Sequence, residues 1–306
     1  SSNSQPDVVE QTKVISRLLP SDIDLLTNSR ENGIVLVGKA ATDTIFGYKY
    51  YNTGDKRLQA AWFKWKLPRP IRYHFIIDDA YYFVSDDNYL QMINLVQTSS
   101  DPSIIQNDID YLIHLDNYTT VTSGTYNSST NQTTFTASWL SGTLTQNGSL
   151  VLIDDADSQP HMGRYIVPTV SGTTITATGN WSGRTLVVGY LYEMLVEFPT
   201  IFVTKQAGEV TLSEITSSLV IHRVKVGLGN VGQYQSKLKR VGKVDFSQIF
   251  ETTIMDAYNA STAPLLEERI ETIPVYEKNT NVDIRVKSTH PAPATLRAMS
   301  WEGSFT

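Results

Sequence analysis

The fold class follows from residues 58–95, which read LQAAWFKWKLPRPIRYHFIIDDAYYFVSDDNYLQMINL. Aromatic and β-branched residues, which favour strands, gather there in four runs, and turns rich in Pro, Asp and Asn separate these runs. The four runs cover residues 58–67, 71–77, 80–84 and 89–95. Short strands at a spacing of roughly ten residues predict an antiparallel meander, which is one blade of a propeller or one sheet of a sandwich or barrel.

The residues before this meander predict a short helical lead-in and two more strands. Apolar residues recur at helical spacing within residues 7–26, and Pro20 interrupts the run. Strands are expected at residues 34–37 and 44–51. We therefore expect residues 1–100 to form one domain, a helical lead-in followed by a propeller-like β-meander.

A sharp rise in Thr, Ser, Gly and Asn follows a predicted linker at residues 97–109. Such a composition fits either a mucin-like, disordered segment or a compact domain of short strands. Alternation in residues 134–140 and 172–178, together with the apolar run at residues 150–153, favours the compact domain. We expect residues 101–183 to form a small Thr/Ser-rich β domain.

The remaining residues predict several further strands. They cover residues 184–190, 192–203, 219–226, 234–241, 270–275, 282–286 and 296–305. We expect residues 184–306 to form an antiparallel, β-sandwich-like C-terminal domain. The predicted fold class is therefore all-β, with a propeller-blade-like meander, a small Thr-rich β domain and this sandwich-like domain in chain order.

Composition limits the functions that the chain can have. Its 306 residues carry 25 Lys and Arg against 31 Asp and Glu, and the net charge of -6 excludes a globally basic nucleic-acid coat. The absence of cysteine excludes disulfides, thiolate metal sites and a cysteine nucleophile. No apolar run reaches the roughly 18 residues that a transmembrane helix needs, so we expect no membrane-spanning segment.

Motifs for catalysis or cofactor binding are weak. Residues 227–232, GLGNVG, match the dinucleotide fingerprint, but strand-like residues follow where a helix would have to begin, so they are interpreted as a hairpin loop. The five histidines lack zinc-site spacing. Asp154, Asp155 and Asp157 lack the other ligands of a calcium loop and are interpreted as a solvated turn. We therefore expect no enzyme, no metal and no cofactor.

Two local basic strips stand out from the acidic background. The first comprises Lys56, Arg57, Lys64, Lys66, Arg69 and Arg72, and the second comprises Arg223, Lys225, Lys237, Lys239, Arg240 and Lys243. Because side chains alternate along a strand, Lys237 and Lys239 would share one face, and with Arg240 and Lys243 they are candidate contacts for nucleic-acid phosphates. Strips of this kind more commonly mark a solvated sheet face or a lysine-protected edge strand, and both interpretations stay open.

From about residue 30 onward, the order of several short motifs resembles the tail tubular protein B family, the tail nozzle proteins of short-tailed podophages. The motifs are a W-x-x-W pair, an S-G-T-Y-N turn, a G-R pair and a terminal W-E-G. They are carried by Trp62, Trp65, Ser123, Gly124, Tyr126, Gly183, Arg184, Trp301, Glu302 and Gly303. Members of this family are much longer, so the resemblance predicts that this chain is a C-terminal portion.

The resemblance implies a structural virion protein that is made in the host bacterial cytoplasm. In this family a hexamer forms the distal ring of the hollow tail, docks tail fibres and surrounds the channel through which DNA leaves. The implied partners are further copies of the chain, the tail adaptor ring protein, tail fibres, the host cell surface and, transiently, genomic DNA. No catalytic residue is implied, because the matched motifs are structural.

A second interpretation is a carbohydrate-binding or carbohydrate-depolymerising module of the virion that recognises a receptor. Trp139, Trp181 and Tyr126 lie in the Thr-rich region, where exposed aromatic rings could stack on sugars. The competing explanation places these rings in a small core, because Trp is highly buried on average.

Overall fold

The structure is a computed structural model that describes residues 11–12, 15–53, 56–106, 108–138, 149–154, 165–207, 210–214, 218–251 and 265–305. Over these residues the regular structure consists of β-strands and one short 3-10 helix, and the predicted all-β class is confirmed. The chain divides into two compact units, Ser1–Ser100 and Asp101–Thr306.

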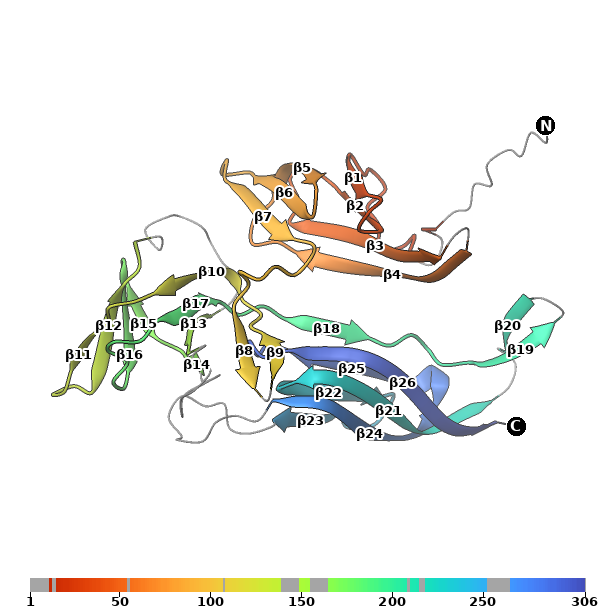
Figure 1. Cartoon of the computed structure of the whole chain (residues 1–306). Helices are drawn as coiled ribbons and strands as arrows, with labels where there is room; N and C mark the ends of the chain where they lie inside the picture. Colours follow the sequence, from red (N-terminus) through yellow and green to blue (C-terminus); the bar gives the residue numbers. More distant parts are fainter. Residues whose placement is uncertain are drawn as a thin grey trace. The chain divides into compact units, whose positions relative to one another are not determined.

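The first unit begins with a four-stranded antiparallel sheet in the order β1-β2-β3-β4 (Figure 1). Its strands are β1 (Leu25–Ser29), β2 (Ile34–Gly38), β3 (Thr44–Thr53) and β4 (Lys56–Lys66). Leu36 and Ile45 are fully buried on its inner face. On the same face the ring of Phe63 lies over Gly47, directly opposite on the neighbouring strand, so that a Cβ at this glycine would collide with the ring.

A three-stranded antiparallel sheet completes the first unit. It consists of β5 (Ile71–Ile77), β6 (Ala80–Ser85) and β7 (Leu90–Asn94), in that order. Its inner face shares one core with the four-stranded sheet. This core contains Leu25, Ile34, Leu36, Ile45, Leu67, Ile71, Tyr81 and Phe83. The two sheets of the unit therefore stabilise each other by burying their inner faces together.

The four strands expected to form one meander in residues 58–95 are divided between these two sheets. β4 pairs with β3, whereas β5 pairs with β6 and β6 with β7. Pro68 and Pro70 lie between β4 and β5 and have no backbone N–H to donate, which disfavours a tight hairpin at this point. Leu67 and Ile71 instead enter the shared core as the chain passes from one sheet to the other.

The helical lead-in expected within residues 7–26 is not found in the described part of this stretch. Residues 15–18 form a turn, and strand β1 begins at Leu25. The side chain of Leu25 is buried in the core that the two sheets share. Pro20 lacks the N–H with which a helix would continue. The rest of the predicted helix lies outside the described residues, at residues 7–10, 13 and 14.

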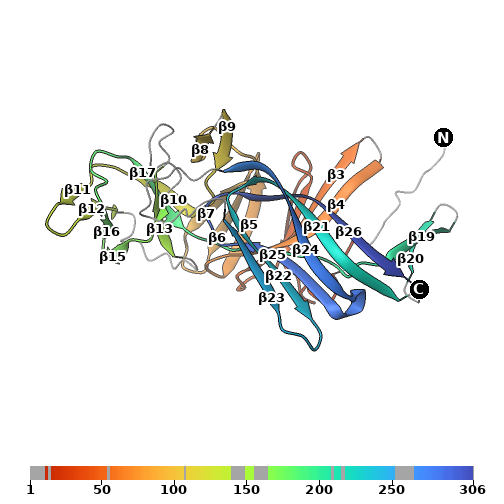
Figure 2. The same cartoon turned by 90° about the horizontal axis from the view of Figure 1, so that it is seen from below.

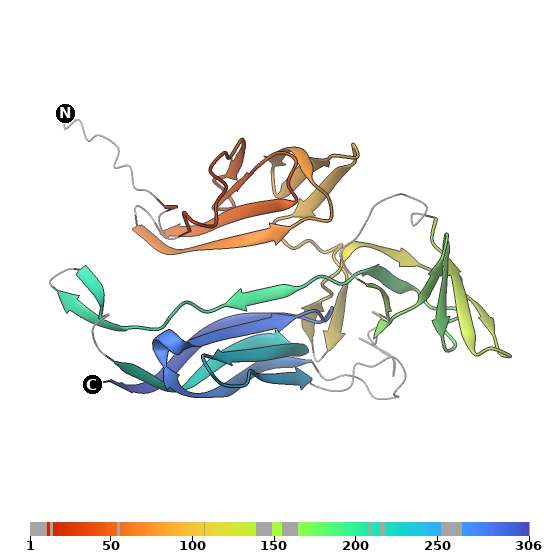
Figure 3. The ribbon, with the colours of Figure 1, turned by 180° about the vertical axis from the view of Figure 1, so that it is seen from behind.

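The second unit contains two four-stranded antiparallel sheets that share a core (Figure 3). The first, in the order β10-β17-β13-β14, contains β10 (Asp116–Val121), β13 (Leu150–Ile153), β14 (Tyr165–Ile166) and β17 (Leu186–Tyr190). The Thr-rich sheet, in the order β11-β12-β16-β15, contains β11 (Thr125–Asn127), β12 (Gln132–Thr136), β15 (Thr169–Ser171) and β16 (Thr174–Thr178). The alternating Thr residues thus do form strands, over the part of the region that is described.

Strand β13 is buried on both faces. Leu150 and Leu152 join the core shared with the Thr-rich sheet, whereas Val151 and Ile153 join a second core on the other side. That second core includes residues of a hairpin formed by β8 (Ser103–Gln106) and β9 (Ile109–Leu112). Burial on both faces explains the continuous apolar run, and the predicted linker at residues 97–109 contains a strand.

The strand that we expected to open the C-terminal domain has a different position. β17 pairs with β10 and with β13, so it lies inside the sheet of the preceding region. Val188 faces the core shared with the Thr-rich sheet and Val187 faces the opposite core. Both faces of β17 are apolar because, like β13, the strand lies between two cores. The order of strands along the chain does not reveal that β17 pairs with β10 and β13.

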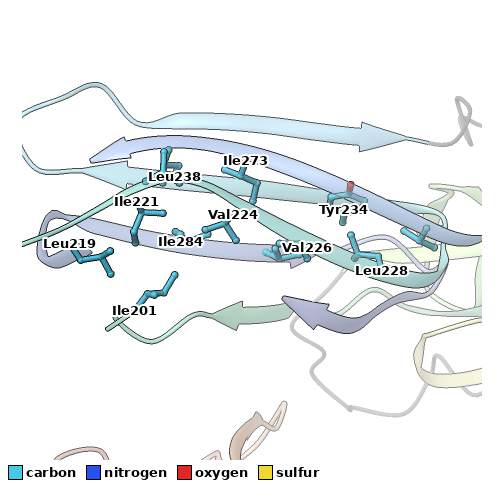
Figure 4. Packing of buried hydrophobic residues seen from close by; sticks show 13 residues of the cluster. Ile201, Leu219, Ile221, Val224, Val226, Leu228, Tyr234, Leu238, Ile273 and Ile284 are labelled. Atoms are coloured by element: carbon cyan, nitrogen blue, oxygen red, sulfur yellow. The ribbon is translucent and has the colours of Figure 1, made fainter. Parts of the chain in front are cut away.

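Two further antiparallel sheets lie around one core in the rest of the second unit. One sheet has the order β18-β25-β22-β23, with β18 (Met194–Glu197), β22 (Gln233–Arg240), β23 (Phe246–Glu251) and β25 (Val282–Ser288). In the other, β21 (Leu219–Val231) lies between the long strands β24 (Leu266–Lys278) and β26 (Ala294–Phe305) (Figure 2). Figure 4 shows Val224, Val226 and Leu228 of β21 in the core with Tyr234 and Leu238 of β22.

The glycine-rich fingerprint at residues 227–232 belongs to this second sheet. It lies in β21 up to Val231 rather than in the expected hairpin loop, and β22 begins directly afterwards at Gln233. At Gly229 the side chain of Arg297 crosses the strand where a Cβ would otherwise be. Two smaller elements are the hairpin of β19 (Val203–Ala207) and β20 (Val210–Glu214), and the 3-10 helix η2 (Asn279–Asn281).

Candidate functional site

Alternation along β22 determines how the second basic strip is presented. Tyr234, Ser236 and Leu238 are buried, so Lys237 and Lys239 project from the opposite, outer face of the sheet. Arg240 is half-buried at the end of the strand, and Lys243 lies in the turn that leads to β23. The structure therefore brings Lys237 and Lys239 together on one surface and separates them from the other two candidates.

Three other cations of this strip, Arg223, Lys225 and Lys243, have carboxylate partners. On the other sheet, Arg223 Nε and Lys225 Nζ lie 2.6 and 2.7 Å from the two carboxylate oxygens of Glu302, and both contacts lower the pKa of that carboxyl. Lys243 Nζ lies 2.7 Å from Glu277 Oε2, and this hydrogen bond lowers the pKa of Glu277. The second basic strip is therefore divided over two sheets, and half of it is neutralised.

The strand beside β22 carries charges that pair with one another. Arg285, directly opposite Lys237, contacts Asp283 at 2.6 Å and Glu197 at 3.1 Å. The hydrogen bond with Asp283 raises the pKa of Arg285. Lys287 likewise contacts Glu193 at 3.2 Å. Across the described residues of this surface, Lys237 and Lys239 are the two cations that no carboxylate contacts.

The paired charges around Lys237 were missed in the sequence, although a signal was present. Residues 282–288 read VDIRVKS, in which apolar and charged residues alternate strictly. That alternation places Asp283, Arg285 and Lys287 on the same face of β25. Glu197, the partner of Arg285, and Glu193, the partner of Lys287, lie about ninety residues earlier in the chain, and local sequence patterns do not connect segments so far apart.

The first basic strip is more dispersed. Lys66 Nζ lies 3.9 Å from Asp43, Arg69 Nε lies 3.5 Å from Asp87, and Arg72 donates a hydrogen bond to Asn88. Lys64 is exposed on β4. The side chains of Lys56 and Arg57 lie outside the described residues.

The W-x-x-W pair places its two rings on opposite faces of β4, because residues three apart in a strand alternate sides. Trp65 packs on the inner face beside Phe63 and Tyr81, with ring centroids 5.0 and 5.8 Å away. Trp62 lies on the other face, 5.0 Å from Tyr48, and donates its indole N–H to the carbonyl of Gln11. Trp65 thus packs against the shared core on one face of β4, and Trp62 binds Gln11 on the other face.

The S-G-T-Y-N motif forms the entry into the Thr-rich sheet. Ser123 has a positive φ of 58°, and at Gly124 a Cβ would lie 2.5 Å from the ring of Phe135, which occupies that space. Strand β11 begins with the next residue, and the hydroxyl of Tyr126 donates to the side chain of Asn131. The first residue of the motif therefore matters for its backbone conformation, and the second for the space it leaves to the ring of Phe135.

The G-R pair forms a specific contact that the sequence did not predict. Gly183 adopts a left-handed φ of 74°, and the next residue, Arg184, forms an ion pair with Asp154. Asp154 is buried at the end of β13, so its interpretation as part of a solvated turn is wrong. Asp155 and Asp157 lie outside the described residues.

Each residue of the terminal W-E-G has a distinct contact. Trp301 packs against the core of the two C-terminal sheets, and Glu302 binds both Arg223 and Lys225 across the strand pair. Gly303 lies so close to the carbonyl oxygen of Val220 that a Cβ would collide with it. The motif therefore attaches the last strand to β21 through packing, charge and close backbone approach.

Burial shifts the pKa of several titratable groups in the described residues; among them, it lowers that of His114 and raises that of Asp116. Burial lowers the pKa of His74 and of His290 to about 4, and the two residues lie in different units. Among the residues described, no group of three or more His, Asp or Glu is arranged to hold a metal ion. His161 lies outside them.

The aromatic residues considered for sugar binding are placed as follows. Trp181 is buried in the core under the Thr-rich sheet and donates its indole N–H to the carbonyl of Thr178. Tyr126 is half-buried, and Trp139 lies outside the described residues. The core explanation holds for Trp181.

Two comparisons with known proteins bear on identity. A protein-family model described as bacteriophage nozzle protein matches residues 1–306, the whole chain. A search of curated proteins finds no match. In the described part of the chain, no helix has the length and apolar character needed to cross a membrane.

Proposed function

The chain belongs to the bacteriophage nozzle protein family, whose members are structural components of the phage tail, and we propose that it forms the distal nozzle ring of a short tail. In this proposal a hexamer of the chain surrounds the DNA exit channel, attaches to the tail adaptor ring and docks tail fibres near the host surface. The protein is synthesised in the host cytoplasm and has no catalytic role. The match of the family model over the full chain is the observation that carries the proposal.

The packing of the sheets supports a propeller-like first unit and a sandwich-like last region. In the first unit, two antiparallel sheets bury their faces against each other, as successive propeller blades do. In the second unit, the sheets that contain β21 and β22 share one core in the same manner as the layers of a sandwich.

Lys237 and Lys239 are the residues that we propose contact the passing DNA. They lie on one outer face, and their charge is not neutralised by a described carboxylate. Arg240 and Lys243 contribute less, because the first is half-buried and the second binds Glu277. In a chain of net charge -6, two cations without a carboxylate contact on this described face would guide DNA without retaining it, since affinity rises steeply with each phosphate contact.

The copy number of the chain in purified virions tests the proposal. Quantitative mass spectrometry with isotope-labelled peptides of this chain should give one hexamer per particle, measured against the known stoichiometry of the capsid protein. Intact tails separated from capsids should retain the same amount. Absence from the tails, or a copy number that a single ring does not fit, would contradict the nozzle assignment.

A further inference from the structure

The sheet that contains β21 has a bulge beside Tyr276. The pairing register shifts between Ile221 and Arg223, so that two residues of β24, Val275 and Tyr276, lie opposite His222 alone. Val275 is fully buried in the core, whereas Tyr276 is 68% exposed. Bulges change the direction of side chains and are over-represented beside functional sites. The place where the register shifts is therefore a candidate binding site.

Tyr276 has a strained backbone conformation that is unusual for an aromatic residue. Its φ is 47°, and among the described residues other than glycine that have a positive φ, it alone is aromatic. Bulges with a left-handed residue commonly have glycine there, because a bulky side chain crowds the backbone. The exposed ring of Tyr276 adds little to the core that would offset this strain. A strained backbone that presents an exposed side chain is typical of ligand sites.

The ring of Tyr276 stacks on the ring of His222. The two ring centroids lie 6.0 Å apart, and the planes are inclined by 20°. His222 is in turn held by β26, because its Nε2 atom lies 3.2 Å from the hydroxyl oxygen of Ser304. The imidazole thus supports the tyrosine ring on one side, and the exposed surface of Tyr276 meets solvent. The three neighbouring strands β24, β21 and β26 together hold a flat aromatic surface in place.

Hydrogen-bonding groups lie beside this aromatic surface. His222 and Arg223 follow each other between two buried residues of β21, so both project from the outer face of the sheet. Arg223 Nε and Lys225 Nζ contact the carboxylate of Glu302 at 2.6 and 2.7 Å. The side chains of these three residues are between 41% and 51% exposed. Their positions are thus fixed by one another, and their remaining donors and acceptors face solvent next to the rings.

We propose that this surface binds a pyranose ring of a bacterial surface polysaccharide. The proposed site consists of Tyr276, His222, Ser304, Arg223 and Glu302. The apolar C–H face of the sugar packs on the exposed tyrosine ring, and its hydroxyl groups bond to the polar side chains beside the ring. Duplex DNA does not use such a surface, because aromatic side chains stack on unpaired bases. The site goes beyond the proposed nozzle ring and does not depend on it, so the copy number in virions tests a separate claim.

Affinity electrophoresis of the full chain in gels that contain polysaccharide tests the site. The two probes are the lipid-linked surface polysaccharide of the host bacterium, freed of its lipid, and the capsular polysaccharide of the same host, in separate gels. At least one probe should retard the wild type, and the gel in which this occurs identifies the source of the sugar. Tyr276→Ala should weaken binding by about tenfold or more, because the stacking surface is lost, and Tyr276→Trp should retain it.

Controls separate loss of the site from loss of the fold. Tyr73→Ala removes a tyrosine of similar exposure in the other unit and should bind like the wild type. Tyr276→Asn should also lose binding, yet its midpoint of urea unfolding should not fall below that of the wild type, because asparagine accepts a left-handed conformation. A wild type that neither probe retards overturns the proposal, as does full binding by Tyr276→Ala. A lower unfolding midpoint in Tyr276→Asn would assign the ring to the fold, and weaker binding of duplex DNA by Tyr276→Ala would assign it to DNA. Both results overturn the proposal too.

Discussion

Arg184 and Asp154 form an ion pair in which the carboxylate side chain is fully buried. Asp154 follows the last residue of β13, and Arg184 follows the left-handed turn residue Gly183. The pair joins two segments that lie thirty residues apart and fixes the turn before β17 against the end of its neighbouring strand. A motif residue that is identified only by family resemblance thereby acquires a physical role.

Removal of the arginine should be costly. In the variant Arg184→Ala the buried carboxylate loses its cation, and breaking a buried pair on one side typically costs about 3–5 kcal/mol. Urea unfolding of the full chain should therefore show a lower free energy of unfolding for this variant. The double variant Arg184→Met with Asp154→Leu should lose less, because it leaves no charge buried. Equal losses in the single and double variants would contradict this role of the pair.

Gly303→Ala tests the close approach in the terminal W-E-G motif. The new methyl group would meet the carbonyl oxygen of Val220, which is held in the strand pair and cannot move away. We expect a loss of about 1–3 kcal/mol in the free energy of unfolding. The adjacent variant Ser304→Ala should change it by only about 0.5 kcal/mol, because it removes an exposed hydroxyl whose side-chain contact is with His222 Nε2 at 3.2 Å. Similar values for the two variants would show that the glycine is not required.

The stability of the chain should fall as the pH is lowered below about 6.5. His74 and His290 have folded-state pKa values of about 4, whereas unfolded histidine titrates near 6.5, so the unfolded chain binds the extra protons in this range. Stability is complete above the unfolded value. For each of the two histidines, the free energy of unfolding should fall by about 2 kcal/mol between pH 7 and pH 5. Protonation of His290 would also remove the Nδ1 lone pair that accepts from the amide of Ala292.

Histidine variants identify the source of this pH dependence. His74→Gln should flatten the dependence in the first unit, and His290→Gln should do so in the second, as measured by thermal unfolding at each pH. A slope unchanged in both variants would assign the pH dependence to other buried groups, such as His114, whose pKa burial also lowers.

The two free lysines should account for weak, salt-dependent DNA binding. Each phosphate contact contributes about -0.9 to the slope of log K against log salt concentration. The double variant Lys237→Gln with Lys239→Gln should therefore make this slope shallower by about 2. Lys225→Gln removes a lysine that Glu302 already neutralises and should leave the slope nearly unchanged. Fluorescence anisotropy with labelled duplex DNA measures both, and an unchanged slope in the double variant would exclude these lysines.

Local strand signals predicted the fold class and many strand positions correctly. The run at residues 71–77 is strand β5 to the residue, because β-branched and aromatic residues there are bounded by Pro70 and Asp78. The apolar run at residues 34–37 is likewise β2, which extends one residue further. In these stretches propensity, turn chemistry and burial all favour the same structure.

Local strand signals could not predict which distant segments of the chain pair with each other. The position of β17 in the middle sheet depends on contacts with β10 and β13 far earlier in the chain. The charge of Asp154 suggested exposure because its partner, Arg184, is thirty residues away. The meander was assigned to one sheet because Pro68 and Pro70 were interpreted as an ordinary turn, whereas they mark the passage between two sheets.

Labelling of intact particles tests the nozzle assignment most directly. Antibodies raised against this chain, with gold-labelled secondary antibodies, would be applied to purified virions of the source phage and viewed by electron microscopy. The account predicts label at the distal end of a short tail, and no label after adsorption of the antibodies with the purified chain. Label on fibres or spikes, or no label on particles that contain the chain by immunoblot, would contradict it.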